Sequence, residues 1–307
     1  MNVTPQNKLT MQLKYFYCLL LVLFSAQSLR SQDTTLLNML NDSMSVNKTN
    51  SYVTGTFKAG HIVNMQTVES PGKNALVFLI QHRFGQINSG SYNFFGLDNA
   101  TLRLGFDYGI NDRLAVGIGR SSYQKTYDAY LKYKLLRQTD GSNKMPFSIS
   151  LLGIITNYTV KIPESPKLTA LERTAYATQI LIARKFSSSF SLQLVPTYLY
   201  YNLTQGTDKN SVFAIGAGGR MKITKRMSIN AEYTYLPSNQ VETIKTHNSF
   251  SLGWDIETGG HVFQLVFTNS QSITETQNIS QTTGNWGDGG IYFGFNLSRV
   301  FNLKKKK

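Results

Sequence analysis

Alternation of apolar and polar residues is the feature that most limits the folds open to this 307-residue chain. Between residues 100 and 110, every second residue is large and apolar, and the residues between are polar, charged, small or glycine. Because side chains alternate across a β-strand, this pattern predicts a strand with one apolar face and one polar face. The apolar face comprises Leu102, Leu104, Phe106, Tyr108 and Ile110.

The same pattern recurs along most of the chain. It predicts strands over residues 74–86, 100–110, 113–121, 125–137, 147–158, 171–186, 190–202, 211–223, 227–236, 248–257, 261–269 and 289–301. Two weaker candidates, residues 51–57 and 62–68, precede these segments. The pattern leaves open whether the weaker pair forms two more strands or a plug.

The links between the predicted strands differ in length. Short links fall at residues 111–112, 122–124, 187–189, 224–226 and 258–260, and longer polar links at 87–99, 139–146, 159–170, 203–210, 237–247 and 270–288. Short turns alternating with long loops, between strands of about ten residues, are typical of outer-membrane barrels. Since backbone groups in lipid must all pair, such a sheet has to close.

A soluble β-sandwich or lipocalin-like barrel would also show alternation. Three features favour the membrane. One face of each strand is almost purely apolar, the other is rich in Gly, Ser, Thr and charge, and aromatic residues such as Tyr198, Tyr233 and Tyr292 crowd the strand ends. Aromatic rings of this kind lie at membrane–water interfaces. We therefore predict an all-β fold, an antiparallel transmembrane β-barrel of 12–14 strands with a short helical or irregular N-terminal segment.

The N-terminus has the composition of an export signal. Lys8 and Lys14 precede about ten apolar residues ending at Phe24, and small residues follow. This order predicts a cleaved signal peptide over residues 1–31 and export to a bacterial outer membrane. The remaining chain divides into an N-terminal segment (32–72) that is a possible plug or periplasmic element, the barrel (73–303) and a basic tail (304–307).

The net charge and the motifs of the chain limit the classes of binding partner that we expect. The chain carries a formal net charge of +14, and a basic exported protein meets anionic lipid or polysaccharide. No RNP-like or helix-turn-helix pattern is present, so nucleic acid is not an expected partner. The final alternating segment, residues 291–301, resembles the C-terminal recognition strand of bacterial outer-membrane proteins. We therefore expect outer-membrane lipid and the barrel-assembly machinery as partners.

Catalytic and metal-binding patterns are absent from the sequence. The one cysteine, Cys18, lies in the predicted signal, and the four histidines (His61, His82, His247 and His261) lack metal-pair spacing. No G-x-S-x-G elbow occurs. We predict no metal, no cofactor and no enzymatic activity. A rim hydrolase using Ser121, Ser122 and His82 is a weaker alternative.

Charged residues on the inward faces form the candidate site. The predicted lumen-lining residues are Arg103, Asp107, Asp128, Lys132, Lys134, Arg173, Lys185, Arg220, Lys222, Glu232 and Asp255. With Glu257 added, bases slightly outnumber acids. Such charges either pair across neighbouring strands and stabilise the barrel, or give a pore with a mild preference for anions.

Several motifs together resemble one family. They are His82-Arg83-Phe84-Gly85, Phe94-Phe95-Gly96-Leu97-Asp98, Arg103 to Ile110, Asp112-Arg113-Leu114, Gly117 to Ser122 and Lys125 to Asp128. The chain resembles the Bacteroidota β-barrel proteins that are labelled only as a domain of unknown function. The resemblance is densest over residues 76–137. It implies a Gram-negative outer membrane and carries no known activity or functional residue.

Two functions remain open from these observations. A barrel of 12–14 strands lies between small barrels filled by side chains and wide porins. The first expectation is passive passage or binding of a small solute through a polar lumen. The alternative is a non-conducting structural or scaffold barrel that binds envelope partners.

Overall fold

The computed structural model describes residues 51–141, 144–161 and 168–303. The predicted signal peptide, residues 32–50 and the basic tail at 304–307 lie outside the described residues, so these expectations remain predictions. Within the described part of the chain, no helix is long and apolar enough to cross a bilayer.

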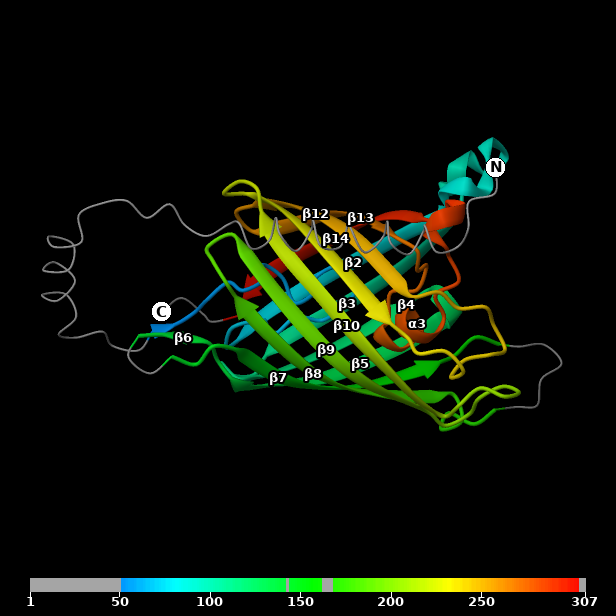
Figure 1. The fold of residues 1–307 in the computed structure, drawn as a ribbon, viewed down its shortest axis with the longest axis horizontal. Coiled ribbons are helices and arrows are strands. Elements are labelled where there is room, and N and C mark those ends of the chain that lie inside the picture. Colours follow the sequence, from blue (N-terminus) through cyan, green and yellow to red (C-terminus); the bar gives the residue numbers. More distant parts are fainter. Residues whose placement is uncertain (1–50, 142–143, 162–167, 304–307) are drawn as a thin grey trace, which may run out of the picture. The chain divides into compact units, whose positions relative to one another are not determined.

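Twelve antiparallel strands form a closed barrel (Figure 1). The strands are β2 (Ala75–Gln86), β3 (Ala100–Gly109), β4 (Leu114–Ser121), β5 (Thr126–Leu136), β7 (Ser148–Tyr158), β8 (Thr174–Lys185), β9 (Phe190–Tyr201), β10 (Ser211–Lys222), β11 (Met227–Tyr235), β12 (Ser249–Thr258), β13 (His261–Thr268) and β14 (Tyr292–Asn302). Each strand pairs with the next along the chain, and β14 pairs with β2 to close the sheet. The prediction of an antiparallel barrel is confirmed.

Side chains alternate between the two faces of this sheet. On β10, for example, Val212 and Ala214 are buried while Phe213 and Ile215 are exposed. Apolar side chains cover the outer face and contact one another across strands, as in the stacked rings of Phe78 and Phe106, whose centroids are 5.0 Å apart. A continuous apolar exterior is what a barrel surrounded by lipid requires.

The barrel has two distinct ends. We call the end with the links 110–113, 186–189, 223–226 and 259–260 the turn end, and the opposite end the loop end. The loop end carries the short helices η2 (Ile87–Ser89), η3 (Ser91–Gly96), η4 (Tyr123–Lys125), α3 (Glu275–Ser280) and η5 (Trp286–Asp288).

Loop length does not separate the two ends strictly. The short link at 122–125 lies at the loop end, and the longer link at 137–147 lies at the turn end. The longer link has a structural role, because its strand β6 (Thr139–Asp140) pairs with β1 (Ser51–Tyr52). The additional length binds the first described residues of the chain.

The weaker strand candidates do not extend the barrel. Only Ser51 and Tyr52 of the first candidate form a strand, and the second contributes a single bridge between His61 and Gln66. Most side chains from 56 to 68 are nevertheless buried. These residues therefore add no thirteenth or fourteenth strand to the barrel, and their burial agrees with the plug alternative.

Candidate functional site: a plugged lumen

Residues 56–69, which we call the plug hairpin, fold back on themselves inside the barrel. The Ile62 N–H donates to the Met65 carbonyl and the Thr67 N–H to the Gly60 carbonyl, both at 2.8 Å. At the base, the Thr56 N–H donates to the Glu69 carboxylate at 2.9 Å. The chain before the hairpin is held by β6, and the chain after it enters β2, both at the turn end. The hairpin is thus inserted into the lumen from the turn end.

One carboxylate of the wall binds the tip of the plug hairpin. Glu232 on β11 accepts the N–H groups of Val63, Asn64 and Met65 at 3.0, 2.9 and 2.9 Å. Three successive N–H groups that converge on one anion form a strong, charge-assisted arrangement. They satisfy a buried acid that no described cation pairs with at ion-pair distance.

Wall side chains also bind the returning arm of the hairpin. Gln193 accepts the Val68 N–H at 2.9 Å and donates to the Gln66 carbonyl at 2.7 Å. The Lys132 ammonium donates to the carbonyls of Thr67 and Glu69 at 2.9 and 3.0 Å. Both residues therefore bind the backbone of the returning arm.

Opposite these contacts, three more wall residues hold the tip. Gln264 donates to the Ile62 carbonyl at 2.7 Å, Asn296 to the Val63 carbonyl at 3.0 Å, and Arg83 to the Asn64 side chain at 2.8 Å. These residues belong to β13, β14 and β2. With Glu232, Gln193 and Lys132, the hairpin is bound from several sides of the barrel.

Apolar contacts also hold the plug in the lumen. The hairpin side chains Phe57, Ile62, Val63, Met65 and Val68 are buried in one cluster with the wall residues Leu152, Leu181, Val195, Leu199 and Val212. Glycines make room for them: a Cβ added at Gly218 would lie 2.4 Å from Cδ1 of Ile62, and one at Gly216 would lie 2.5 Å from Cε of Met65. The inner face over β7–β10 is therefore more apolar than the sequence pattern predicted.

A second segment enters the barrel from the loop end. Residues 269–282, which we call the inward loop and which include α3, are almost completely buried. Tyr158 and Tyr201 on the wall donate to Thr276, at 3.1 and 3.0 Å. Gln277 donates to Gln124 and Thr126, and Ser249 donates to Asn278. These partners come from well-separated parts of the barrel wall, so the loop caps the lumen.

The two inserted segments meet inside the barrel. The Gln66 N–H of the plug hairpin donates to the Glu275 carboxylate of the inward loop at 2.9 Å, and Gln179 donates to the other oxygen at 3.4 Å. Burial raises the pKa of Glu275 to about 7, and the hydrogen bond from Gln66 partly offsets this rise. A hydrogen bond to a titratable carboxylate, that of Glu275, therefore joins the plug hairpin and the inward loop.

The structure places ten of the eleven predicted lumen residues in strands. Six are buried: Arg103, Asp107, Lys132, Arg220, Glu232 and Asp255. Four are partly buried: Asp128, Lys134, Lys185 and Lys222. Arg173 precedes β8 and donates to the Val160 carbonyl at 2.7 Å, so it lies at the loop end and not within a strand as predicted.

Some of these charges pair with one another, and others bind the plug. Arg103 forms an ion pair with Asp128, and Arg220 with Glu257 at 2.7 Å. Glu257 also pairs with Lys58 of the plug hairpin at 2.8 Å. Glu232 and Lys132, by contrast, bind plug backbone. The prediction that the lumen charges pair across strands thus describes only some of the predicted lumen-lining residues.

Sequence reasoning missed the uncharged half of this site. Gln193, Gln264 and Asn296 make four of the hydrogen bonds to the plug, yet a single amide on a polar strand face has no distinguishing pattern. Glu275 lies in a segment predicted only as a long polar link. Its burial depends on partners far away in the chain, such as Gln66 and Gln179.

The residues of the hydrolase alternative are not brought together. His82 lies on the outer face, with its ring centroid 5.0 Å from that of Phe295, whereas Ser121 is buried on the inner face. The Ser122 hydroxyl accepts the Leu102 N–H at 2.9 Å. Among the residues that the structure describes, no three His, Cys, Asp or Glu side chains gather closely enough to hold a metal ion.

Solved structures of similar fold include two porins and an outer-membrane protein. The NanC porin aligns with a TM-score of 0.48 at 7% identity, over 74% of this chain and 100% of that chain. The KdgM porin aligns with a TM-score of 0.44 at 9% identity, over 73% and 99%. Omp33 of Acinetobacter baumannii gives 0.42 at 9% identity, over 76% and 100%. These likenesses concern the fold alone.

No curated protein matches the sequence significantly. A family model matches residues 57–301, which include the plug hairpin from Phe57 onward, all twelve strands of the barrel and the inward loop. The match covers most of the chain and agrees with the closed barrel observed. The chain belongs to the family described as a membrane bound beta barrel domain (DUF5777).

Proposed function

We propose that this chain is an outer-membrane barrel for the passage of small solutes, closed at rest by the plug hairpin and the inward loop. The observation that carries the proposal is how the plug is held. Hydrogen bonds from individual side chains bind its backbone, and no wall strand forms a β-ladder with it. Water can replace such bonds one by one when the hairpin leaves, so the plug is a separable part.

The wall that the plug covers suits polar solutes. Departure of the hairpin frees the anion of Glu232, the cations of Lys132 and Arg83, and the amides of Gln193, Gln264 and Asn296. Charges of both signs and neutral amides favour small polar solutes, with only a weak preference between ions. The predicted mild anion preference stays part of this proposal.

Liposome swelling tests passage directly. The variant lacks residues 56–69, whose ends lie side by side at the Thr56–Glu69 hydrogen bond, and carries a short Gly-Ser linker in place of residues 271–282. We expect swelling in small sugars and amino acids that falls off with solute size, and little swelling with the unaltered chain. A folded variant that admits none of these solutes would exclude passage.

The apolar cluster favours a second candidate function. Five plug side chains are buried in this cluster, and burying each stabilises the closed state by about 1.5–3 kcal/mol. A barrel held closed in this way can serve as a scaffold that presents its loops or N-terminal segment to envelope partners. Under this reading the plug never leaves, and crosslinking it to the wall leaves cellular function intact.

Export and assembly complete the proposal. The predicted signal peptide (residues 1–31) would direct the chain to the barrel-assembly machinery, and the final strand, β14, would present the recognition pattern at its C-terminal end. Fractionation of cells expressing the full chain tests this location. We expect the protein in the outer membrane, with a mass matching cleavage between Ser28 and Ser31.

A further inference from the structure

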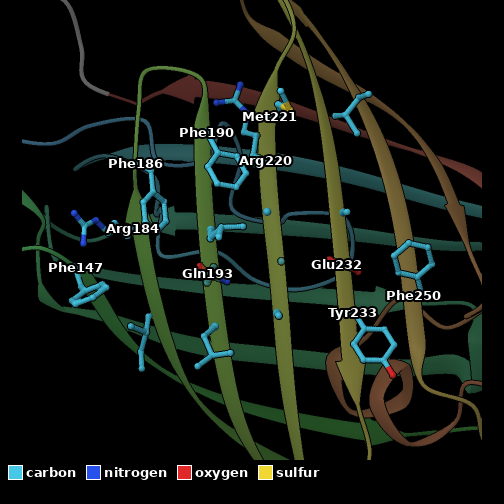
Figure 2. A pocket seen from close by; sticks show the side chains of 18 residues that line it. Phe147, Arg184, Phe186, Phe190, Gln193, Arg220, Met221, Glu232, Tyr233 and Phe250 are labelled. Atoms are coloured by element: carbon cyan, nitrogen blue, oxygen red, sulfur yellow. The ribbon is translucent and has the colours of Figure 1, made fainter. Parts of the chain in front are cut away.

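The outer face of the barrel is hollowed over strands β9, β10 and β11. Small residues replace large ones on neighbouring strands: Gly219 pairs with Ala231 on β11 and with Leu192 on β9, and Ala217 pairs with Leu194 and Tyr233. The resulting groove has a volume of about 650 Å³, and its lining is almost entirely apolar (Figure 2). It lies on the face that the apolar exterior assigns to lipid.

An arginine lies at the edge of this groove. Arg184 is on the outer face of β8, one residue from its turn end, and pairs with Leu192. Its guanidinium is 5.7 Å from the ring centre of Phe147 and 5.0 Å from that of Phe186 (Figure 2). Its Nε is buried, and no described residue offers it a hydrogen-bond partner or an ion pair.

Among the described strands, the charged side chains of the outer face are all positive. The acids of the twelve described strands, Asp107, Asp128, Glu232, Asp255 and Glu257, alternate with the outward residues and belong to the inner face. Arg120, Arg184 and Arg299 are on the outer face, each beside an aromatic ring. The wall of a second copy would therefore offer Arg184 no carboxylate, whereas lipid headgroups offer an anion.

The arrangement recurs near the loop end. A second outer groove of about 530 Å³ is lined by Leu104, Phe106, Ile118, Ala129 and Ile155. Arg120 lies at its edge, 5.4 Å from the ring centre of Tyr127, and is likewise outside the ion pairs of the described residues. An apolar hollow with an unpaired arginine at its edge thus occurs near each end of the barrel.

We propose that the groove over Ala217, Gly219 and Ala231 binds one acyl chain of a phospholipid whose phosphate is bound by Arg184. Guanidinium and phosphate match in charge and in geometry. Within a bilayer, an acyl chain is already out of water, so it gains only closer packing when it enters the groove. A groove that fits the chain therefore binds it more tightly than the surrounding lipid does. The position of Arg184 near the turn end places the phosphate at the membrane surface on that side.

Native mass spectrometry of the mature chain tests the site, after extraction from bilayers of phosphatidylethanolamine and phosphatidylglycerol. We expect the unaltered protein to retain a phospholipid. Arg184→Gln removes the phosphate partner, and Ala217→Leu fills the groove without altering the inner face. Each should lower the retained fraction about tenfold. Arg184→Gln loses a charge-assisted hydrogen bond to the phosphate, and Ala217→Leu loses the close packing of the acyl chain. Arg299→Gln, which removes an outer arginine at the same end that does not line the groove, is the matched control.

Three results would overturn the assignment of the phosphate to Arg184. They are absence of retained lipid on the unaltered protein, equal retention by Arg184→Gln, and an equal loss in Arg299→Gln, which would indicate charge alone. Unchanged retention by Ala217→Leu would refute the acyl-chain assignment. Heat-modifiable migration on gels establishes that each variant is folded.

Discussion

Glu232 shows how a single buried acid can organise the lumen. Its carboxylate accepts three backbone N–H groups of the plug hairpin, at residues 63 to 65. A buried carboxylate is costly unless such donors satisfy it, so the wall and the plug stabilise each other. The buried charge of Glu232 therefore needs the N–H groups of the plug, and the position of the plug depends on that charge.

Glu232→Gln tests this dependence. The amide keeps the size of the side chain but loses the charge, and its NH₂ group cannot accept the N–H groups that converge there. We expect hydrogen exchange at Val63, Asn64 and Met65 to accelerate about tenfold or more. Glu242→Gln, the same change on an exposed loop residue, serves as the control. Unaltered exchange in Glu232→Gln would show that the carboxylate does not hold the tip.

Glu275 predicts a pH dependence of the closed state. Burial raises its pKa from 4.5 to about 7 in the inward position, whereas an exposed acid titrates near its ordinary value. Between about pH 4.5 and 7 the inserted acid keeps its proton and the exposed acid loses it. The inward position therefore becomes less stable as the pH rises through this window. Hydrogen exchange of residues 272–280 should accelerate from pH 5 to pH 7, beyond its intrinsic rate change.

Glu275→Gln provides the comparison for that measurement. The amide is uncharged at every pH, so the excess acceleration should disappear while the fold is retained. An acceleration of the same size in Glu275→Gln would assign the effect to another group.

At the scale of elements, the plug hairpin and β10 fit because two glycines face the lumen. A side chain at Gly218 would collide with Ile62, and overpacking of this kind costs about 1–3 kcal/mol. We expect Gly218→Val to displace the hairpin and to open the 56–69 segment to protease. Gly153→Ala, at a position where an added Cβ meets nothing within 4 Å, should leave cleavage unchanged. Equal protection in both variants would contradict the fit.

The strands were predictable because their signal is local. The pattern over residues 190–202 predicts β9 (Phe190–Tyr201), and that over 211–223 predicts β10 (Ser211–Lys222), each within a residue. Lipid on one side and polar surroundings on the other impose the same alternation on every strand. Strand β8 begins later than predicted, at Thr174, because the chain before it forms a turn, in which the Arg173 N–H donates to the Thr169 carbonyl and the Thr174 N–H to the Leu171 carbonyl.

The closure of the lumen was not predictable in the same way. Residues 62–68 resemble a short strand, but many of their partners are side chains far away in the chain. Gln193, Glu232 and Glu275, for example, are 125 to 209 residues from the groups they bind. The inward loop has the polar composition of an exposed link, and it is buried only because the wall satisfies its hydrogen bonds. Contacts between distant polar groups leave no periodic trace in a sequence.

At the scale of the whole molecule, we propose that two separable segments close a polar lumen. Single-channel conductance in planar bilayers tests it most directly, on the unaltered chain and on the variant that lacks residues 56–69 and carries the linker in place of 271–282. We predict no conductance for the unaltered protein, and steady conductance steps with weak ion selectivity for the variant. A variant that migrates as a folded barrel yet shows no conductance would show that these two segments are not what closes the lumen.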